Sequence, residues 1–314
     1  MYTELSFKGI YHIDHVIIFK GETGKKGSKR GERKKPTKEE MNRWNHRKKV
    51  ERLKHVIQAN FVPGDYYLTL KYPKGERPSM EKVKKDFTKF RELMKKHYKK
   101  HGLAMKYIYR IEIGKRGGIH LHVIMNRVQD GFSVLNRCWR KARGVTELED
   151  MIAEETGQIP DMVTMDGKVD VENLYLEGGY QELAEYMCKP LPDDVDIREE
   201  DKKELLKIGS SRNLIRPEPE EKTYTRRTVE TLKESGPEKI NTDPALRKRF
   251  CAAGCLIDKT TWKSGVNPFT GMSYICYTEY RLRRRDEKNN DLPKQRHKKH
   301  PPGKRTRSMA VCVE

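Results

Sequence analysis

Two histidines one residue apart are the first chemical feature of this chain. His120 and His122 lie in the apolar stretch IHLHVIM, residues 119–125. Because side chains alternate along a strand, both imidazoles point to one face, while Leu121 and Val123 point to the other. Leu121 and Val123 can pack into a core, so the two imidazoles stand together on the opposite side.

A glutamate is expected to face these histidines across a hairpin. The turn GKRGG suits a five-residue hairpin loop. With the turn centred on Arg116, Glu112 lies opposite His120 and Arg110 lies opposite His122. Opposed residues point to the same face with their Cβ atoms about 5 Å apart. One carboxylate and two imidazoles then converge, and this set can bind a divalent cation with positions left open for water or substrate.

Other interpretations of the histidines stay open. They could be ordinary sheet residues beside a solvated glutamate. The pair His12 and His15 competes as a site, although its spacing puts the two on opposite faces of a strand. Two histidines and a carboxylate are also the ligand set of non-haem iron oxygenases, which would require iron for activity.

A tyrosine near a lysine offers a second kind of chemistry. Tyr186 and Lys189 are three residues apart, so they share one face of a helix. A tyrosine hydroxyl can attack a phosphodiester and form a covalent phosphotyrosine when positive charge stabilises the phosphate oxygens. The alternative is a tyrosine at the edge of the core with an extended lysine. Tyr180 and Tyr175 are rival nucleophiles.

Charge points to a polyanionic partner. The chain has 314 residues and a formal net charge of +21, which favours nucleic acid. The basic segments 25–35 and 281–307 could grip phosphates without reading sequence; the alternative is solubilising charge. The six cysteines are scattered, which predicts reduced thiols rather than a zinc site. No signal peptide or membrane span is recognisable, so we expect a soluble cytoplasmic protein.

The predicted elements alternate between strands and helices. Their order favours an α+β fold with a mainly antiparallel central sheet and flanking helices. We expect a core over 61–190, preceded by residues 1–60 with strands, a basic loop and a joining helix, and followed by a polar extension, 191–314, with a basic tail. The predicted elements are strands within 3–20, helix 38–58, strand 65–73, helix 80–100, hairpin 107–127, helix 132–141, strand 167–176 and helix 178–190.

Three motifs in order resemble those of HUH endonucleases. They are YYLTLKYP at 66–73, a glutamate eight residues before HLH, and YMCK at 186–189. The resemblance covers about 43–217. It is greatest to rolling-circle replication initiators of bacterial phages, plasmids and integrative elements, to which LKHVIQANFVPGDYYLTLKYP and SSRNLIRPEP are also similar.

This resemblance implies a fold, a reaction and a metal. The HUH fold would hold Mg²⁺ or Mn²⁺ and nick single-stranded DNA at an origin, leaving a 5′-phosphotyrosine and a 3′-OH that primes synthesis, followed by strand transfer. The metal ligands implied are Glu112, His120 and His122, and the catalytic residues are Tyr186 and Lys189. Residues expected to shape the site or bind DNA are Thr69, Tyr72, Arg110, Arg116 and Arg212.

Partners and alternatives follow from what the sequence lacks. No G-x-x-x-x-G-K-[ST] phosphate loop is present, so a host helicase would unwind the DNA and a host polymerase would extend it. Tyr180 is not one turn from Tyr186, which favours a one-tyrosine site. A one-tyrosine transposase or relaxase would share the chemistry, and a non-catalytic DNA-binding regulator would bind without cleaving.

Overall fold

The computed structural model divides the chain into two units, Met1–Leu282 and Arg283–Glu314. The second unit, the basic loop 25–35 and the tail beyond 281 lie outside the residues that the structure describes. The described residues are 1–19, 36–73, 75–114, 116–144, 169–175, 177–192, 197–267 and 272–281. No helix within these ranges is long and apolar enough to span a membrane.

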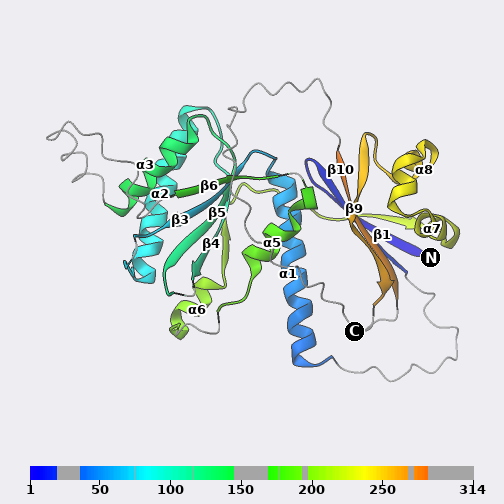
Figure 1. Ribbon diagram of the computed structural model, residues 1–314, viewed down its shortest axis with the longest axis horizontal. Helices are drawn as coiled ribbons and strands as arrows, with labels where there is room; N and C mark the ends of the chain where they lie inside the picture. The colour runs from blue at the N-terminus through cyan, green and yellow to red at the C-terminus, as the bar shows by residue number, and fades with distance from the viewer. Residues whose placement is uncertain are drawn as a thin grey trace, which may run out of the picture. The chain divides into compact units, whose positions relative to one another are not determined.

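A five-stranded sheet carries the predicted hairpin (Figure 1). Every pairing within it is antiparallel, so the expected α+β class with a mainly antiparallel sheet is confirmed. We call it the hairpin sheet. Its strands, in the order β6-β3-β5-β4-β7, are β6 (Val169–Asn173), β3 (Tyr66–Lys71), β5 (Ile119–Met125), β4 (Tyr107–Ile113) and β7 (Ile208–Ser210).

One face of the hairpin sheet packs against two helices, α2 (Met80–Lys100) and α3 (Gly131–Arg143). The apolar side chains of α2 recur at helical spacing and form a buried stripe, as their sequence positions predict. Leu121 and Val123 of β5 lie in the same cluster and are fully buried. The imidazoles between them in sequence therefore face the other side of the sheet.

The opposite face is covered by α1 (Lys38–Asn60), the 3₁₀ turn η1 (Glu177–Tyr180) and α5 (Gln181–Cys188). Ile108 and Ile124 of the sheet pack there against Ile57 of α1 and Met187 of α5. This second cluster covers only part of the face. It places the last turn of α5 next to the histidines of β5.

The N-terminal strands do not join the hairpin sheet. They form a second sheet, whose order is β8-β1-β2-β10-β9. Both edges of the hairpin sheet are taken, one by β6 and the other by β7, which explains the difference from the expectation. The elements of this second part are β1 (Tyr2–Lys8), β2 (His12–Phe19), β8 (Glu220–Tyr224), α7 (Arg226–Thr242), α8 (Pro244–Phe250), β9 (Cys255–Val266) and β10 (Ser273–Arg281).

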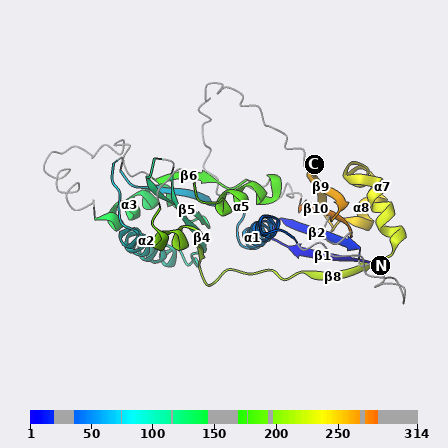
Figure 2. The same cartoon turned by 90° about the horizontal axis from the view of Figure 1, so that it is seen from below.

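Residues after 190 therefore contribute to both sheets. The helix α6 (Glu199–Leu205) buries Leu205 in the core of the hairpin sheet. Residues 211–219 then run from β7 to β8 (Figure 2). The sequence left the fold of 191–314 open, and the three-part division of the chain stays a prediction.

The helix α1 contacts the second sheet through a buried polar network. The carboxylate of Asp14 on β2 lies 2.6 Å from Lys54 Nζ and accepts a hydrogen bond from Gln58 Nε2 at 3.3 Å. Gln58 Nε2 also donates to the Gly179 carbonyl at 3.0 Å. At the turn between β1 and β2, a side chain at Gly9 would meet the Gln58 backbone at 2.7 Å, so only glycine fits. This network connects the second sheet to the start of α5.

Candidate metal and tyrosine site

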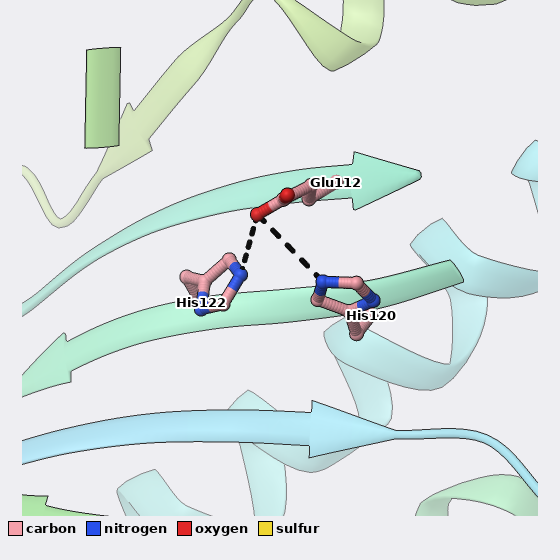
Figure 3. A group of neighbouring side chains, drawn as sticks. All are labelled: Glu112, His120 and His122. Atoms are coloured by element: carbon pink, nitrogen blue, oxygen red, sulfur yellow. Dashed lines mark ion pairs between the residues drawn. The ribbon is translucent and has the colours of Figure 1, made fainter. Parts of the chain in front are cut away.

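The hairpin register is the predicted one. Glu112 pairs with His120 and Arg110 pairs with His122. Figure 3 shows the glutamate and both histidines on one face of β4 and β5. Glu112 Oε2 lies 2.6 Å from His122 Nε2 and 3.7 Å from His120 Nε2. Within the described ranges this is the one group of three or more such side chains close enough to hold a metal ion, with ligand atoms within 4.8 Å of one another.

The neighbouring strand β3 orients His122. The Tyr67 hydroxyl lies 2.7 Å from His122 Nδ1, and the Thr69 hydroxyl lies 3.3 Å from the same atom. When Nε2 serves as the metal ligand, the Nδ1–H donates to Tyr67, and this fixes both the tautomer and the ring. Thr69 thus lies at the site, where the first motif predicts it. Sequence reasoning missed Tyr67, although its position two residues before Thr69 puts both on one face.

Burial and charge set the ionisation of the ligands. Burial lowers the pKa of His122, although Glu112 opposes this effect, so the imidazole is neutral and able to bind a metal. Burial alone would raise the pKa of Glu112. Hydrogen bonds from His120, His122 and Lys189 outweigh it and hold that pKa well below its usual range. The glutamate is therefore ionised.

Tyr186 lies against the same carboxylate. Its hydroxyl donates to Glu112 Oε2 at 3.3 Å and is 3.2 Å from His122 Nε2. Lys189 Nζ forms an ion pair with Glu112 Oε1 and lies 4.5 Å from the centre of the Tyr186 ring. The tyrosine is 40% exposed, so an outside molecule can reach it. Burial and the Glu112 charge raise the pKa of Tyr186, and Lys189 opposes them.

Arg110 holds the tyrosine helix and does not reach the surface. Its guanidinium is buried against the ends of two helices, so it is not available for the predicted contact with DNA. Nη1 donates to the Met187 carbonyl at 3.1 Å, and Nε donates to the Leu205 carbonyl at 3.3 Å. Met187 directly follows Tyr186. Arg110 therefore fixes the backbone from which the tyrosine extends.

The other expected DNA-binding residues lie apart from the ligands. Tyr72 is three residues from Thr69, and its side chain packs in the core on the other face of the sheet. There its hydroxyl donates to Asp86 at 3.0 Å and its ring meets Trp139 edge-on. Arg116 is exposed at the hairpin turn, and Arg212 is exposed after β7.

The rival tyrosines have different surroundings. Tyr180 is buried in the cluster between α1 and α5, and its ring meets His12 edge-on at 5.3 Å between ring centres. Burial raises the pKa of Tyr180 far above its usual range. Tyr175, just after β6, is exposed to solvent. Tyr186 is the one of the three that the structure brings to Glu112.

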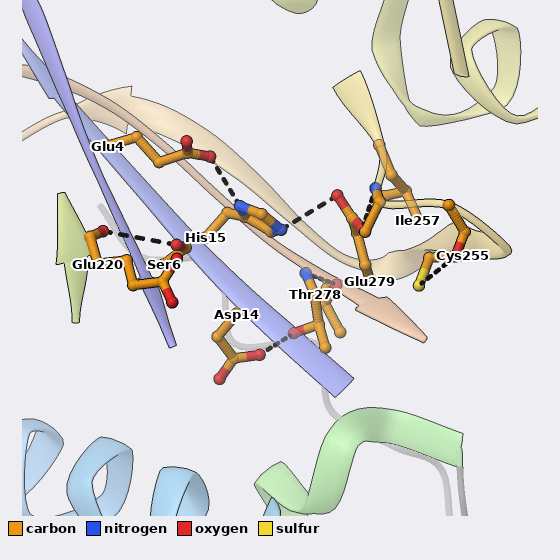
Figure 4. Close-up of polar contacts among 12 residues, drawn as sticks. Glu4, Ser6, Asp14, His15, Glu220, Cys255, Ile257, Thr278 and Glu279 are labelled. Carbon is orange, nitrogen blue, oxygen red and sulfur yellow. Dashed lines mark hydrogen bonds and ion pairs between the residues drawn. The ribbon is translucent and has the colours of Figure 1, made fainter. Parts of the chain in front are cut away.

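The rival histidine pair belongs to an ionic cluster in the second sheet. His15 Nδ1 lies 2.7 Å from Glu4, and its Nε2 lies 3.1 Å from Glu279 (Figure 4). The two carboxylates occupy opposite edges of the ring, so they do not converge on one point as metal ligands must. Burial would lower the pKa of His15, but hydrogen bonds to Glu279 and Glu4 raise it to about 9. The cluster is a buried ion network.

The donor set of the hairpin suits a divalent cation. Ligands at about 2.1 Å from a metal lie roughly 3 to 4 Å apart, which is the spread of Glu112, His120 and His122. One ionised carboxylate and neutral imidazoles are the species that bind metals. The hydroxyls of Tyr67 and Thr69 supply the outer contacts that such a site needs.

Residues 65–191 match a family model described as a replication-associated protein of the ORF2 type. The matched segment runs from just before β3 to just after α5, so it contains all three candidate ligands and Tyr186. No curated protein and no solved structure matches the chain. The match supports a replication-associated protein of the rolling-circle initiator kind.

Proposed function

We propose that the protein is an HUH-type initiator that nicks single-stranded DNA at a replication origin, with Tyr186 as the nucleophile. The observation that carries this proposal is the position of the Tyr186 hydroxyl. It lies 3.2 Å from His122 Nε2 and 3.3 Å from Glu112 Oε2, two atoms of the candidate metal group. A phosphate beside that group is within reach of the tyrosine.

The reaction exchanges one phosphoester bond for another. The Tyr186 oxygen forms a bond to phosphorus, and the bond from phosphorus to the 3′ oxygen breaks. The phenol proton passes to water, and the departing 3′ oxygen takes up a proton. The 5′-phosphate stays on Tyr186 while the free 3′-OH is available to a polymerase. Attack of a later 3′-OH on the phosphotyrosine reverses these steps and joins the strand.

The side chains around the phosphate divide the electrostatic work. Glu112, together with His120 and His122, would hold Mg²⁺ or Mn²⁺, which supplies positive charge to polarise the phosphate. Glu112 raises the pKa of Tyr186 and so disfavours the phenolate, whereas Lys189 favours it. The ammonium of Lys189 also lies where it can stabilise charge that develops on the phosphate oxygens.

The proposed substrate defines the partners. Single-stranded origin DNA in a bacterial cytoplasm would be the substrate, a host helicase would open the duplex, and a host polymerase would extend the 3′-OH. Exposed Arg116 and Arg212 are proposed to contact the DNA strand.

A covalent-adduct assay tests the proposal. The protein is mixed with labelled single-stranded origin DNA and Mn²⁺ or Mg²⁺, and a band that survives boiling in SDS is sought. The band is expected to vanish with EDTA, with Tyr186→Phe and with His120→Ala, but to persist with Tyr180→Phe. Tight, salt-sensitive binding with no adduct on any origin strand would contradict the proposal and favour a regulator.

A further inference from the structure

The N-terminal half of α1 is an exposed helical segment. All nine residues from Met41 to Lys49 are exposed, whereas Val50, Leu53 and Ile57 further along the helix are buried. We call residues 41–49 the α1 arm; it lies toward the N-terminal end of the helix in Figure 1. A capping box between Thr37 and Glu40 holds the first turn in place. The chain therefore keeps an exposed stretch helical with a dedicated cap.

The arm is cationic and carries an exposed aromatic ring. It contains Arg43, Arg47, Lys48 and Lys49, and no acidic residue. Lys49, at its end, donates to the Leu206 carbonyl at 3.0 Å. Trp44 is 44% exposed, and Lys48 Nζ lies 3.6 Å from the centre of its ring. At about 100° per residue, the side chains of Arg43, Arg47, Trp44 and Lys48 fall on one side of the helix.

We propose that the α1 arm binds duplex DNA beside the strand that is nicked, and this inference rests on the proposed function. Closely spaced cations without intervening acids match the phosphates of a duplex. A single helix, about 10–12 Å across, fits the major groove, where Trp44 offers a flat surface to sugars or base edges. A membrane surface would need a continuous apolar stripe, and a protein interface would be depleted in lysine at its core.

The position of α1 gives this contact a purpose. The buried half of the same helix packs on Ala184 and Met187 of α5, the latter directly after Tyr186. Because α1 is one continuous helix from Lys38 to Asn60, DNA held on the arm is held rigidly with respect to the tyrosine helix. The arm spans about 14 Å, or roughly four base pairs, so duplex on the arm would set which phosphate reaches Tyr186.

A binding experiment with matched variants tests the arm. The probes are a hairpin with a stem of about 10 base pairs and a single-stranded tail, and the tail alone, with affinity measured by fluorescence anisotropy over a salt series. The arm variant is Arg43→Gln/Arg47→Gln. The control variant, Lys95→Gln/Lys96→Gln, removes the same charge from exposed positions on α2, across the hairpin sheet. Thermal melting checks that both variants are folded.

The arm variant is expected to bind the hairpin about tenfold more weakly than the control variant, with a log–log salt slope about two units shallower than that of the wild type. Both variants should bind the tail equally. Equal affinity of the two variants for the hairpin would overturn the inference. So would loss of binding to poly-glutamate with DNA binding unchanged, which would indicate an acidic protein partner.

Adduct formation on the tail alone separates this inference from the proposed function. The arm variant should form the adduct on the tail of an origin strand as the wild type does. If the wild type forms no adduct while the arm variant alone loses hairpin binding, the arm stands and the nickase proposal fails. If the wild type forms the adduct and hairpin binding is unchanged in the arm variant, the reverse holds.

Discussion

Tyr67 controls the orientation of His122 from outside the ligand set. Its hydroxyl contacts His122 Nδ1, and its ring stacks parallel to the imidazole at 5.7 Å between ring centres. Thr69 makes a longer contact with the same nitrogen. A phenylalanine at 67 would keep the stacking and remove the shorter hydrogen bond, so it isolates the effect of that bond.

We expect Tyr67→Phe to weaken Mn²⁺ binding about tenfold, because outer contacts of this kind typically contribute roughly 10- to 100-fold in metal affinity. Mn²⁺ titration by calorimetry measures the effect. The control is Tyr66→Phe, the adjacent residue on the same strand, whose hydroxyl donates to Val128 on the other face of the sheet. Equal affinity of both variants for Mn²⁺ would show that Tyr67 has no part in the site.

At the scale of elements, Arg110 joins the hairpin to α5 and α6. Replacing it with methionine leaves two buried carbonyl oxygens, of Met187 and Leu205, without these donors. We expect Arg110→Met to destabilise the fold by about 2–3 kcal/mol, measured by urea denaturation. The rate of adduct formation should fall more than the affinity for single-stranded DNA, because the displaced group is the tyrosine and not the DNA surface.

A matched variant on the other face of the sheet controls for general loss of stability. Arg91 on α2 donates to the Tyr107 hydroxyl at 2.8 Å, far in the fold from α5. Arg91→Met should change the adduct rate and the DNA affinity alike. A similar split between rate and affinity in both variants would remove the positioning role of Arg110.

The elements of the hairpin could be predicted because their signals are local. Alternation along 119–125 and the length of the GKRGG turn were enough to place Glu112 opposite His120. The contacts of Arg110 could not be foreseen, because cross-strand pairing tells which face a side chain takes but not which helix covers that face. Tyr72 shows the same limit: its place in a motif suggested DNA, whereas its neighbours make it a core residue.

At the scale of the whole molecule, the second sheet joins distant parts of the sequence. Tyr2 of β1 pairs with Tyr224 of β8, and His15 of β2 pairs with Tyr277 of β10. Such pairings leave no local periodic signal, which is why the sequence did not reveal this sheet. The buried His15, between Glu4 and Glu279, lies at its centre and makes the stability of the fold depend on pH.

The pH dependence of stability has a definite sign. The pKa of His15 is raised from 6.5 to about 9, so its ion pairs contribute fully below pH 6.5 and are lost as pH rises toward 9. We expect His15→Gln to lower the free energy of unfolding by about 2–3 kcal/mol at about pH 6 and by much less at about pH 9. Urea denaturation across this pH range measures the difference. His101→Gln, an exposed histidine, is the control, and a difference that stays constant with pH would contradict the assignment.

The identity of the residue that carries DNA is the most direct test of the central claim. The adduct formed with Mn²⁺ and an origin strand would be digested with trypsin and nuclease, and the modified peptide sequenced by mass spectrometry. The expected result is a nucleotide on Tyr186, within reach of Glu112 and His122. A nucleotide on Tyr175 or Tyr180, or on any residue away from the candidate metal group, would contradict the account.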